Sequence, residues 1–342
     1  MKIFGLDIGT EAIKAVELNP EGSRYRLLHF GMAPMPASLQ SEAEKDQQAI
    51  ASAISKLLSQ SGIALKTPVL ALPESQVFSR VIEMTPLSEA ELKNAIRWEA
   101  EQYVPIPLEE ASLDYQIIKE RVKTNDGVEK MEVFLIAVAK SLIDKYSRVL
   151  NLAELQPVAM ETELIAISRA LLGSTVPETD HRLIISLGSQ SSDLAIVQNS
   201  QIVYTRSLNT GGQALARAIA KSLNLDLTQA EEYKKSYGLD ESKLEGKVAL
   251  AMKPVFDLII DEIKKAILFY EEKAKVKLQT ALLAGGTVLM PGAVPYLAGS
   301  LSMEVIVGDP LKNVIVDDPK NQPALNITPF YTTAIGLAMK KI

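Results

Sequence analysis

The chain has 342 residues, enough for two or more domains, and its 47% hydrophobic and 23% charged residues exclude a wholly disordered or fibrous protein. It has no cysteine and only two histidines, which excludes a disulfide scaffold, a zinc thiolate site and a cysteine nucleophile. The formal net charge of −6 indicates no nucleic-acid partner, because nucleic acids are bound mainly through a surplus of positive charge.

The first half of the chain predicts two kinds of unit in succession. Apolar segments separated by turn residues predict a three-stranded meander, followed by a helix and a short buried strand. A strand, a helix with N-cap Ser88 and a capping box completed by Glu91, and two further strands predict a small inserted α+β unit, with a hairpin turn at 124–127. The expected strands are 2–7, 12–18, 25–32, 68–72, 77–84, 113–122, 131–139 and 156–160, and the expected helices are 43–61, 88–103 and 141–152.

The second half repeats the opening pattern from His181 onward. Three more apolar segments predict a second meander, and paired glycines at 211–212 precede the first of several helices. The expected strands are 182–188, 194–197, 202–208 and 280–284, and the expected helices are 213–223, 228–237, 245–275 and 329–341. The recurrence of the opening pattern predicts a duplicated α/β fold.

Two segments bear on membrane targeting. The N-terminal segment reaches Asp7 and Glu11 before any apolar stretch long enough for a signal peptide, so the chain is expected to start in the cytoplasm. Residues 278–303 carry no charge, but glycines and prolines interrupt them repeatedly. This segment therefore predicts a buried strand, a turn and a helix instead of a membrane span.

The first glycine turn, LDIGT at residues 6–10, is a candidate phosphate and metal site. Gly9 lets a phosphate approach the backbone closely, and the hydroxyl of Thr10 can donate a hydrogen bond to it. Asp7 would hold Mg²⁺ through water, and Lys14 would add a positive charge. Taken alone, these residues also fit an ordinary β-turn.

The second glycine turn, SLGSQSS at residues 186–192, lies at the same place in the second meander. Two matching turns, with Gly188 and Ser189 in the second copy, suggest that a phosphate chain is held between the two halves. This repetition is more informative than either turn by itself.

Three further pieces are candidates for contacts with a nucleotide. Gly285, Gly286 and Thr287 end a buried strand, where the backbone can approach a base or ribose, although an ordinary strand-to-helix turn fits as well. The glycines at 211–212 open a helix whose free amides suit phosphate or ribose oxygens. Glu231 and Lys234 lie three residues apart on one helical face, which also fits a surface ion pair.

Together these pieces, in this order and spacing, resemble the actin and sugar-kinase ATPase superfamily over nearly the whole chain. The segments GLDIGTEAIKAVEL, RWEAEQYVPIPLEEASLDYQ, METELIAISRALL and YTTAIGLAM are similar to the PilM family of type IV pilus assembly, in the FtsA branch of that superfamily. The resemblance implies an α/β, duplicated actin-like (RNase H-like) ATPase fold with an inserted α+β subdomain, named 1C. It implies subdomain 1A at 1–76, 156–176 and 327–342, subdomain 1C at 77–155, subdomain 2A at 177–220 and 276–326, and subdomain 2B at 221–275.

The resemblance implies that ATP and Mg²⁺ are the cofactors and gives each candidate a position. The implied ligands are Asp7, Gly9, Thr10 and Lys14 at the first phosphate motif, with Asp7 also at the metal; Gly188 and Ser189 at the second; Gly211 and Gly212 near the phosphates and ribose; Glu231 and Lys234 at ribose and base; and Gly285, Gly286 and Thr287 at adenosine.

One departure from the family pattern affects catalysis. The second phosphate motif usually carries an aspartate where this chain has Ser186. A missing carboxylate removes a group that could order the metal or the attacking water, so weak or absent ATP hydrolysis is expected. Glu161, Glu163 and Asp193 are candidates for that role, and solvated or strand-edge carboxylates are the alternative interpretation.

The same resemblance implies a scaffold with a peptide partner, the short cytoplasmic N-terminus of PilN, and contacts with other platform proteins and the assembly ATPase. The protein would then lie at the inner face of the cytoplasmic membrane through its partner alone. Tyr103, Val104, Pro105 and Ile106 are candidates for the peptide groove, or for a buried junction between subdomains 1A and 1C. An FtsA-like cell-division scaffold and a small-molecule kinase of the same superfamily are the alternatives.

Overall fold

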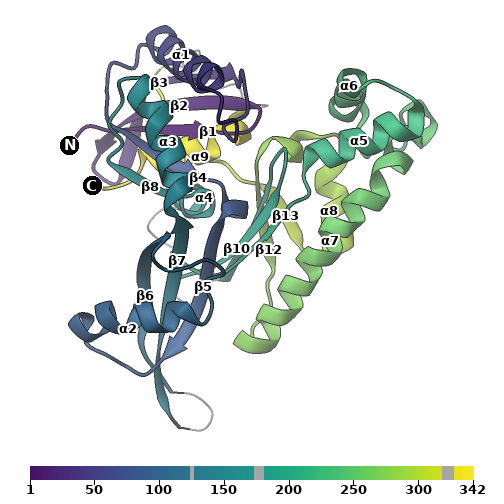
Figure 1. The fold of residues 1–342 in the computed structure, drawn as a ribbon. Helices are drawn as coiled ribbons and strands as arrows, with labels where there is room; N and C mark the ends of the chain where they lie inside the picture. Colours follow the sequence, from purple (N-terminus) through teal and green to yellow (C-terminus); the bar gives the residue numbers. More distant parts are fainter. Residues whose placement is uncertain (124–126, 173–180, 318–326) are drawn as a thin grey trace.

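The computed structural model describes residues 1–123, 127–172, 181–317 and 327–342, which build three β-sheets and their helices (Figure 1). Two larger units lie beside each other, and the smallest sheet projects from their junction. The expected hairpin turn at 124–127 therefore falls largely outside the described residues. Among those that are described, no helix is long and apolar enough to span a bilayer.

The first sheet has the strand order β14-β3-β2-β1-β4-β8. Its central strands β1 and β4 are buried along their whole length because helices cover both faces. On β4, Leu70 and Leu72 face α1 and α3, whereas Val69 and Ala71 face α4 and α9. The elements are β1 (Phe4–Ile8), β2 (Ala12–Glu21), β3 (Arg24–Pro34), α1 (Glu44–Ser61), β4 (Pro68–Leu72), α3 (Lys140–Leu152), β8 (Ala159–Thr162), α4 (Glu163–Leu172), β14 (Val314–Ile315) and α9 (Thr332–Ala338).

The second sheet repeats the first with the order β11-β10-β9-β12-β13. In each sheet an antiparallel meander is followed by two parallel strands on the side of its first strand, which confirms the predicted duplication. One face packs on α5 to α8, and the other packs on α4 and the third sheet. The elements are β9 (His181–Leu187), β10 (Ser192–Gln198), β11 (Gln201–Leu208), α5 (Gly212–Leu223), α6 (Leu227–Tyr237), α7 (Lys247–Ala274), β12 (Thr280–Ala284), α8 (Ala293–Leu301) and β13 (Glu304–Val307).

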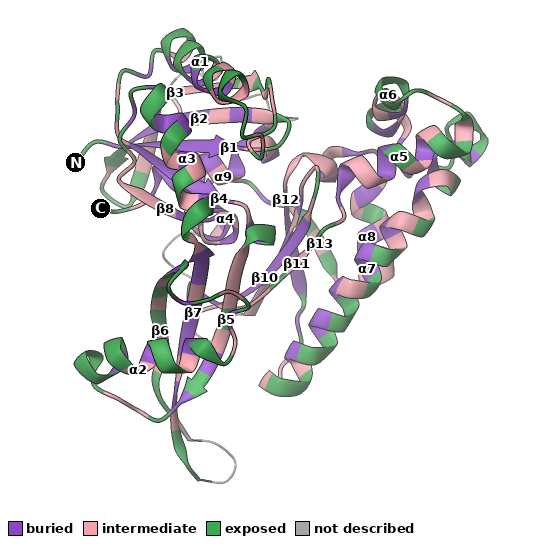
Figure 2. Ribbon diagram, in the orientation of Figure 1, coloured by how far each residue is buried: buried purple, intermediate pink, exposed green. Residues whose placement is uncertain are grey.

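The third sheet is the predicted insert, with the order β5-β7-β6 and one helix on its outer side. Ser88 and Glu91 form the expected capping box at the start of that helix. Figure 2 shows that the helix is exposed on its outer side, while Leu92 and Ile96 are buried against the sheet. The elements are β5 (Val77–Met84), α2 (Glu89–Glu101), β6 (Ala111–Lys123) and β7 (Glu129–Ala139).

Two boundaries in the structure differ from those expected. Helix α3, which the predicted insert at 77–155 includes, packs with α1 on the first sheet, so the insert ends near Ala139. The predicted subdomains 2A and 2B share one buried cluster, and the division between them stays a prediction. Strand β8 begins at Ala159, two residues after Pro157, which lacks a backbone donor.

The uncharged segment 278–303 forms strand β12, a 3₁₀ turn (Gly286–Leu289) and helix α8, as predicted. The predicted C-terminal helix is divided into a 3₁₀ turn (Thr328–Tyr331) and the shorter α9. Strands β13 and β14 were not predicted, because four-residue and two-residue strands carry too little periodicity to be recognised.

Candidate functional site

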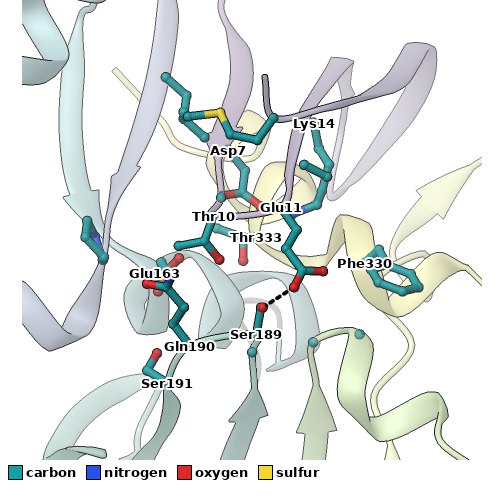
Figure 3. Close-up of a pocket in the computed structure, with 18 of the residues that line it drawn as sticks. Asp7, Thr10, Glu11, Lys14, Glu163, Ser189, Gln190, Ser191, Phe330 and Thr333 are labelled. Carbon is teal, nitrogen blue, oxygen red and sulfur yellow. Dashed lines mark hydrogen bonds and ion pairs between the residues drawn. The ribbon is translucent and has the colours of Figure 1, made fainter. Parts of the chain in front are cut away.

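A cleft of about 1100 Å³ lies where the glycine turns of the two repeated sheets face each other (Figure 3). It contains most of the residues that the sequence singled out, although they come from five separate stretches of the chain. The predicted residues that line it are Asp7, Gly9, Thr10, Lys14, Glu163, Gly188, Ser189, Asp193, Glu231, Lys234, Gly285, Gly286 and Thr287. The cleft is therefore the candidate functional site.

The two glycine turns have the same backbone geometry. The amide of Gly9 donates to the carbonyl of Ala12 over 3.1 Å, and the amide of Gly188 donates to that of Ser191 over 3.0 Å. A Cβ added to Gly9 would lie 3.1 Å from the Ala12 carbonyl oxygen, which is tighter than ordinary contact. The matching turns make the two sides of the cleft structurally equivalent.

Asp7 and Lys14 form an ion pair at the base of the first turn. They face each other across β1 and β2, and the Lys14 Nζ lies 2.7 Å from Asp7 Oδ2. Both side chains are largely removed from solvent, with 13% of Lys14 and 6% of Asp7 exposed. An ammonium has three donors, so Lys14 retains capacity for a further acceptor in the cleft.

Gly211 and Gly212 are not among the residues that line the cleft, so their contact with phosphate or ribose stays a prediction. The amides of Gly212 and Gln213 donate to the carbonyls of Gly188 and Ser189, over 3.0 and 2.9 Å. These amides at the start of α5 are therefore used inside the protein. A Cβ on Gly211 would lie 2.7 Å from the Ser189 carbonyl oxygen, so the glycine permits α5 to support the second turn from behind.

Lys234 joins α6 to the start of α5 at the edge of the cleft. Its side chain is buried, and its Nζ donates to Glu231 Oε2 over 2.7 Å and to the Gly212 carbonyl over 3.0 Å. Lys235 also pairs with Glu231 at 3.6 Å. The hydroxyl of Thr287 donates to the Gly188 carbonyl over 3.0 Å, which ties the third glycine segment to the second turn.

The Gly285-Gly286 segment lies against the C-terminal part of the chain. Gly285 has φ of +87° and faces the Leu187 carbonyl, so a side chain is excluded there by both conformation and space. A Cβ on Gly286 would lie 2.1 Å from a ring carbon of Phe330. Phe330, which lines the cleft and covers Gly286, was not identified from the sequence.

Three carboxyl groups at the back of the site have raised pKa values; Asp193 and Glu74 are buried, and Glu163 is half-buried. Desolvation raises the pKa of Asp193, although the hydroxyls of Ser191 and Ser207 donate to it. Desolvation, together with the charges of Asp7 and Asp193, raises the pKa of Glu163 well above its ordinary value. Glu163 lines the cleft, whereas the side chain of Glu74 lies behind it.

Glu74 was not identified from the sequence. Burial and the nearby charge of Asp193 raise its pKa to about 7, and its Oε2 is buried with no hydrogen-bond partner among the described residues. Its other oxygen accepts a hydrogen bond from Ser79, which in turn contacts Thr205 of the second sheet at 2.8 Å. Glu74 therefore lies where the insert meets both halves.

Glu161 is not a cleft residue, which corrects its candidacy for positioning water. Both of its oxygens bind the guanidinium of Arg169, at 2.6 and 2.9 Å, and Lys340 adds a bond at 2.8 Å. The carboxylate is fully engaged in joining β8, α4 and the C-terminal segment. Its role in this structure is to hold these elements together.

The four candidate partner-binding residues lie between α2 and β6. Val104 is buried in the core of the insert, as in the buried alternative to a groove, although its neighbours there belong to the insert itself, and Tyr103 packs under the Arg80 guanidinium at 4.4 Å. Pro105 is exposed and Ile106 is half-buried. Trp98, on the neighbouring helix α2, has 73% of its surface exposed.

The described residues contain no group of three or more acidic or imidazole side chains arranged to hold a metal ion. A Mg²⁺ ion in the cleft would therefore need ligands from a bound molecule in addition to Asp7. This fits the preference of Mg²⁺ for water and phosphate oxygens over an all-protein cage.

Comparison with known proteins identifies the family. The sequence model of the family described as "Type IV pilus assembly protein PilM" matches residues 5–342. A structure titled "PilM-PilN type IV pilus biogenesis complex" is similar with a TM-score of 0.86 and 27% identity, over 99% of this chain and 98% of that one.

More distant relatives share the fold. The cell division protein FtsA of Neisseria meningitidis serogroup B is 23% identical over 97% of this chain and 88% of its own. MreB 5 of Spiroplasma citri, solved with AMPPNP, is 12% identical, with a TM-score of 0.55 over 98% of this chain and 94% of that one. The duplicated fold is thus actin-like, and the FtsA-like alternative is not favoured. Because the family model covers nearly the whole sequence, the chain belongs to the PilM family of type IV pilus assembly proteins.

Proposed function

We propose that this chain is a nucleotide-dependent scaffold of type IV pilus assembly, which holds ATP and Mg²⁺ in the cleft and a PilN peptide at the insert. The observation that carries the proposal is the pair of matching glycine turns facing each other across the cleft. The MreB 5 structure, which has the same fold, is described as bound to AMPPNP, a close analogue of ATP.

The polar groups of the cleft suit a phosphate chain that carries a divalent cation. Apart from Glu163 and Asp193, whose pKa values are raised, the cleft is lined by three acidic side chains, Asp7, Glu11 and Glu231, and three lysines, Lys14, Lys234 and Lys235. The lysines are thus matched by carboxylates and leave no surplus positive charge for a free triphosphate, whereas its Mg²⁺ complex carries less negative charge. Asp7 would hold the metal through water, Lys14 and the turn hydroxyls would face the phosphates, and Glu231, Gly285 and Gly286 would border the nucleoside.

Isothermal titration calorimetry with ATP and ADP, with and without Mg²⁺, tests the cofactor proposal. We expect Mg²⁺-dependent binding that Asp7→Ala weakens at least tenfold, about 1.4 kcal/mol. Asp261→Ala, an exposed site on α7, serves as the matched control and should bind as the wild type does. Equal affinity in Asp7→Ala and the wild type would contradict the site.

We propose the segment 103–110 as part of the PilN-binding surface. The segment follows α2 and ends beside the first sheet, since Lys140 at the start of α3 donates to the carbonyls of Glu109 and Glu110 over 2.7 Å each. It therefore borders both the insert and the first half. Pro105 and Ile106, with the edge of Tyr103, present apolar surface there, and an extended peptide is a common ligand of such grooves.

Fluorescence anisotropy with a labelled PilN cytoplasmic peptide tests this surface. Pro105→Glu places a charge on an exposed apolar site and should weaken binding at least tenfold. Leu258→Glu makes the same change at an exposed site on α7 and should leave binding unaltered. If both variants bind as the wild type does, the peptide binds elsewhere.

The proposed location is the cytoplasmic side of the inner membrane, with PilN as the membrane link and with the other platform proteins and the assembly ATPase as further partners. Liposome flotation separates this proposal from direct membrane binding. The protein alone should remain at the bottom of the gradient, and it should float with vesicles that contain full-length PilN.

A further inference from the structure

Glu11 connects the two glycine turns across the mouth of the cleft. It lies on the first turn, between β1 and β2, and its Oε1 accepts hydrogen bonds from Ser189 Oγ at 2.5 Å and from Gln213 Nε2 at 3.4 Å. Ser189 belongs to the second turn and Gln213 to the start of α5. Figure 3 shows the Glu11 carboxylate directed from the upper turn to the Ser189 hydroxyl below.

The partners of Glu11 distinguish it from the other cleft carboxylates. Asp7 is paired with Lys14 and Glu231 with Lys234, and burial raises the pKa values of Glu163 and Asp193. Glu11 is exposed, and within the described ranges 1–123, 127–172, 181–317 and 327–342 it has no ion pair with a lysine or arginine. Its partners are instead an uncharged hydroxyl and an uncharged amide.

These two donors are the kind that a phosphate oxygen would use at the second turn. A carboxylate and a phosphate are both anionic acceptors, so they compete for the same hydroxyl and repel each other at contact distance. A nucleotide with its base near Gly285 and Glu231, as proposed above, would extend its phosphates toward the two turns that line the same cleft. In that pose Glu11 lies where the third phosphate would have to enter.

We infer that Glu11 occupies part of the terminal-phosphate position in the nucleotide-free protein and is a specificity residue that lowers the preference for ATP over ADP. This inference rests on the proposed nucleotide site and adds a residue that the family resemblance did not assign. Because Glu11 is exposed, its side chain can leave Ser189 without opening the core. The Glu11 carboxylate still repels the third phosphate of ATP, whereas ADP lacks that phosphate and avoids most of the repulsion.

Calorimetric titration of Glu11→Gln with Mg·ATP and Mg·ADP tests the inference. Glutamine keeps the size of the side chain and an oxygen that accepts from Ser189, but removes the charge. We expect ATP affinity to rise at least tenfold, about 1.4 kcal/mol, while ADP affinity changes less than about threefold. Glu272→Gln, at an exposed carboxylate on α7, should change neither affinity.

The experiment distinguishes failure of the inference on Glu11 from failure of the proposed cofactor. If the wild type binds ATP and ADP and Asp7→Ala abolishes both, but Glu11→Gln leaves their ratio unchanged or weakens ATP, the inference on Glu11 fails and the proposed cofactor stands. If the wild type binds neither nucleotide, the proposed cofactor and the inference fail together. Melting temperatures of all variants, expected within a few degrees of the wild type, exclude misfolding as the cause.

Discussion

Lys14 and Asp193 occupy equivalent positions in the two repeated hairpins. Lys14 faces Asp7 across β1 and β2, and Asp193 faces Ser186 across β9 and β10 in the same register. The first hairpin therefore presents an acid paired with a base, whereas the second presents a hydroxyl opposite a buried acid. The two sides of the cleft have the same strand register but differ in charge. We therefore expect a phosphate chain to make its cationic contact in the first half, with Lys14.

Replacing Lys14 should therefore affect nucleotide binding more than any exposed lysine does. Lys14→Ala removes the ammonium and leaves the buried Asp7 without its partner, so we expect at least a tenfold loss of Mg·ATP affinity, about 1.4 kcal/mol. Calorimetry measures the loss. Lys264→Ala, on the exposed side of α7, is the matched control. An unchanged affinity in Lys14→Ala would show that phosphates do not reach the first turn.

Gly211 supports the second turn, so adding a methyl group there should impair the site from behind. In Gly211→Ala the Cβ would meet the carbonyl oxygens of Gly188 and Ser189 at 2.8 and 2.7 Å, and backbone atoms cannot move as freely as a side-chain end. We expect a loss of about 1–3 kcal/mol of stability, as for overpacked cores, and at least tenfold weaker ATP binding.

Gly299→Ala is the control for this change. Gly299 lies in α8, and an added Cβ has no heavy atom within 4 Å. Alanine favours a helix interior over glycine by up to about 1 kcal/mol, so this variant should be as stable as the wild type or more stable. Thermal melting and calorimetry of the pair separate steric damage at the turn from a general effect of glycine replacement.

The duplicated fold could be predicted because its signal is local and repeated. The spacing from Asp7 to Lys14 equals that from Ser186 to Asp193, and in an antiparallel hairpin equal spacing gives equal register. The buried central strands are likewise predicted from local apolar segments, and the glycine turns from the glycines that follow those segments. These features depend on neighbours within one hairpin.

The cross-cleft contacts could not be predicted, because they depend on how the two halves are oriented. Glu11 and Ser189 are 178 residues apart, and nothing near either residue indicates the other. Phe330 reaches Gly286 by the same long-range packing. At Gly211 and Gly212 the sequence predicted the start of a helix with free amides, but it could not show that the second turn accepts hydrogen bonds from the amides of Gly212 and Gln213.

Glu74 should make the protein less stable as the pH rises from about 4.5 to about 7. Its pKa is about 7 in the folded protein and 4.5 in the reference state, so the folded state binds the proton more tightly over this range. The contribution of Glu74 to stability is therefore greatest below pH 4.5 and falls with rising pH, by about 3 kcal/mol for a shift of this size. Glu74→Gln stays neutral and should remove this loss.

Urea denaturation at pH 5 and pH 8 measures the effect. The stability difference between the two pH values should be smaller in Glu74→Gln than in the wild type, and the variant should be the more stable protein at pH 8. Glu272→Gln, at an exposed carboxylate, should keep the wild-type difference. A Glu74→Gln profile parallel to the wild type would mean that Glu74 titrates normally when folded.

Glu161 should matter for stability and not for nucleotide binding, in contrast to Glu163 two residues later. Its side chain is 5% exposed and binds Arg169 and Lys340, and Arg169 also donates to the Gly336 carbonyl over 2.6 Å. Glu161→Gln leaves two cations without their counter-charge, and losing one partner of a buried ion pair costs on the order of 3 kcal/mol.

Glu154→Gln provides the comparison. Glu154 Oε2 also pairs with a lysine, Lys66 Nζ, at 3.8 Å, but the Glu154 side chain is 86% exposed. Its loss should cost less than about 1 kcal/mol. Both variants should bind Mg·ATP within about twofold of the wild type, since neither residue lines the cleft. A tenfold loss of ATP affinity in Glu161→Gln, with stability unchanged, would return Glu161 to the site.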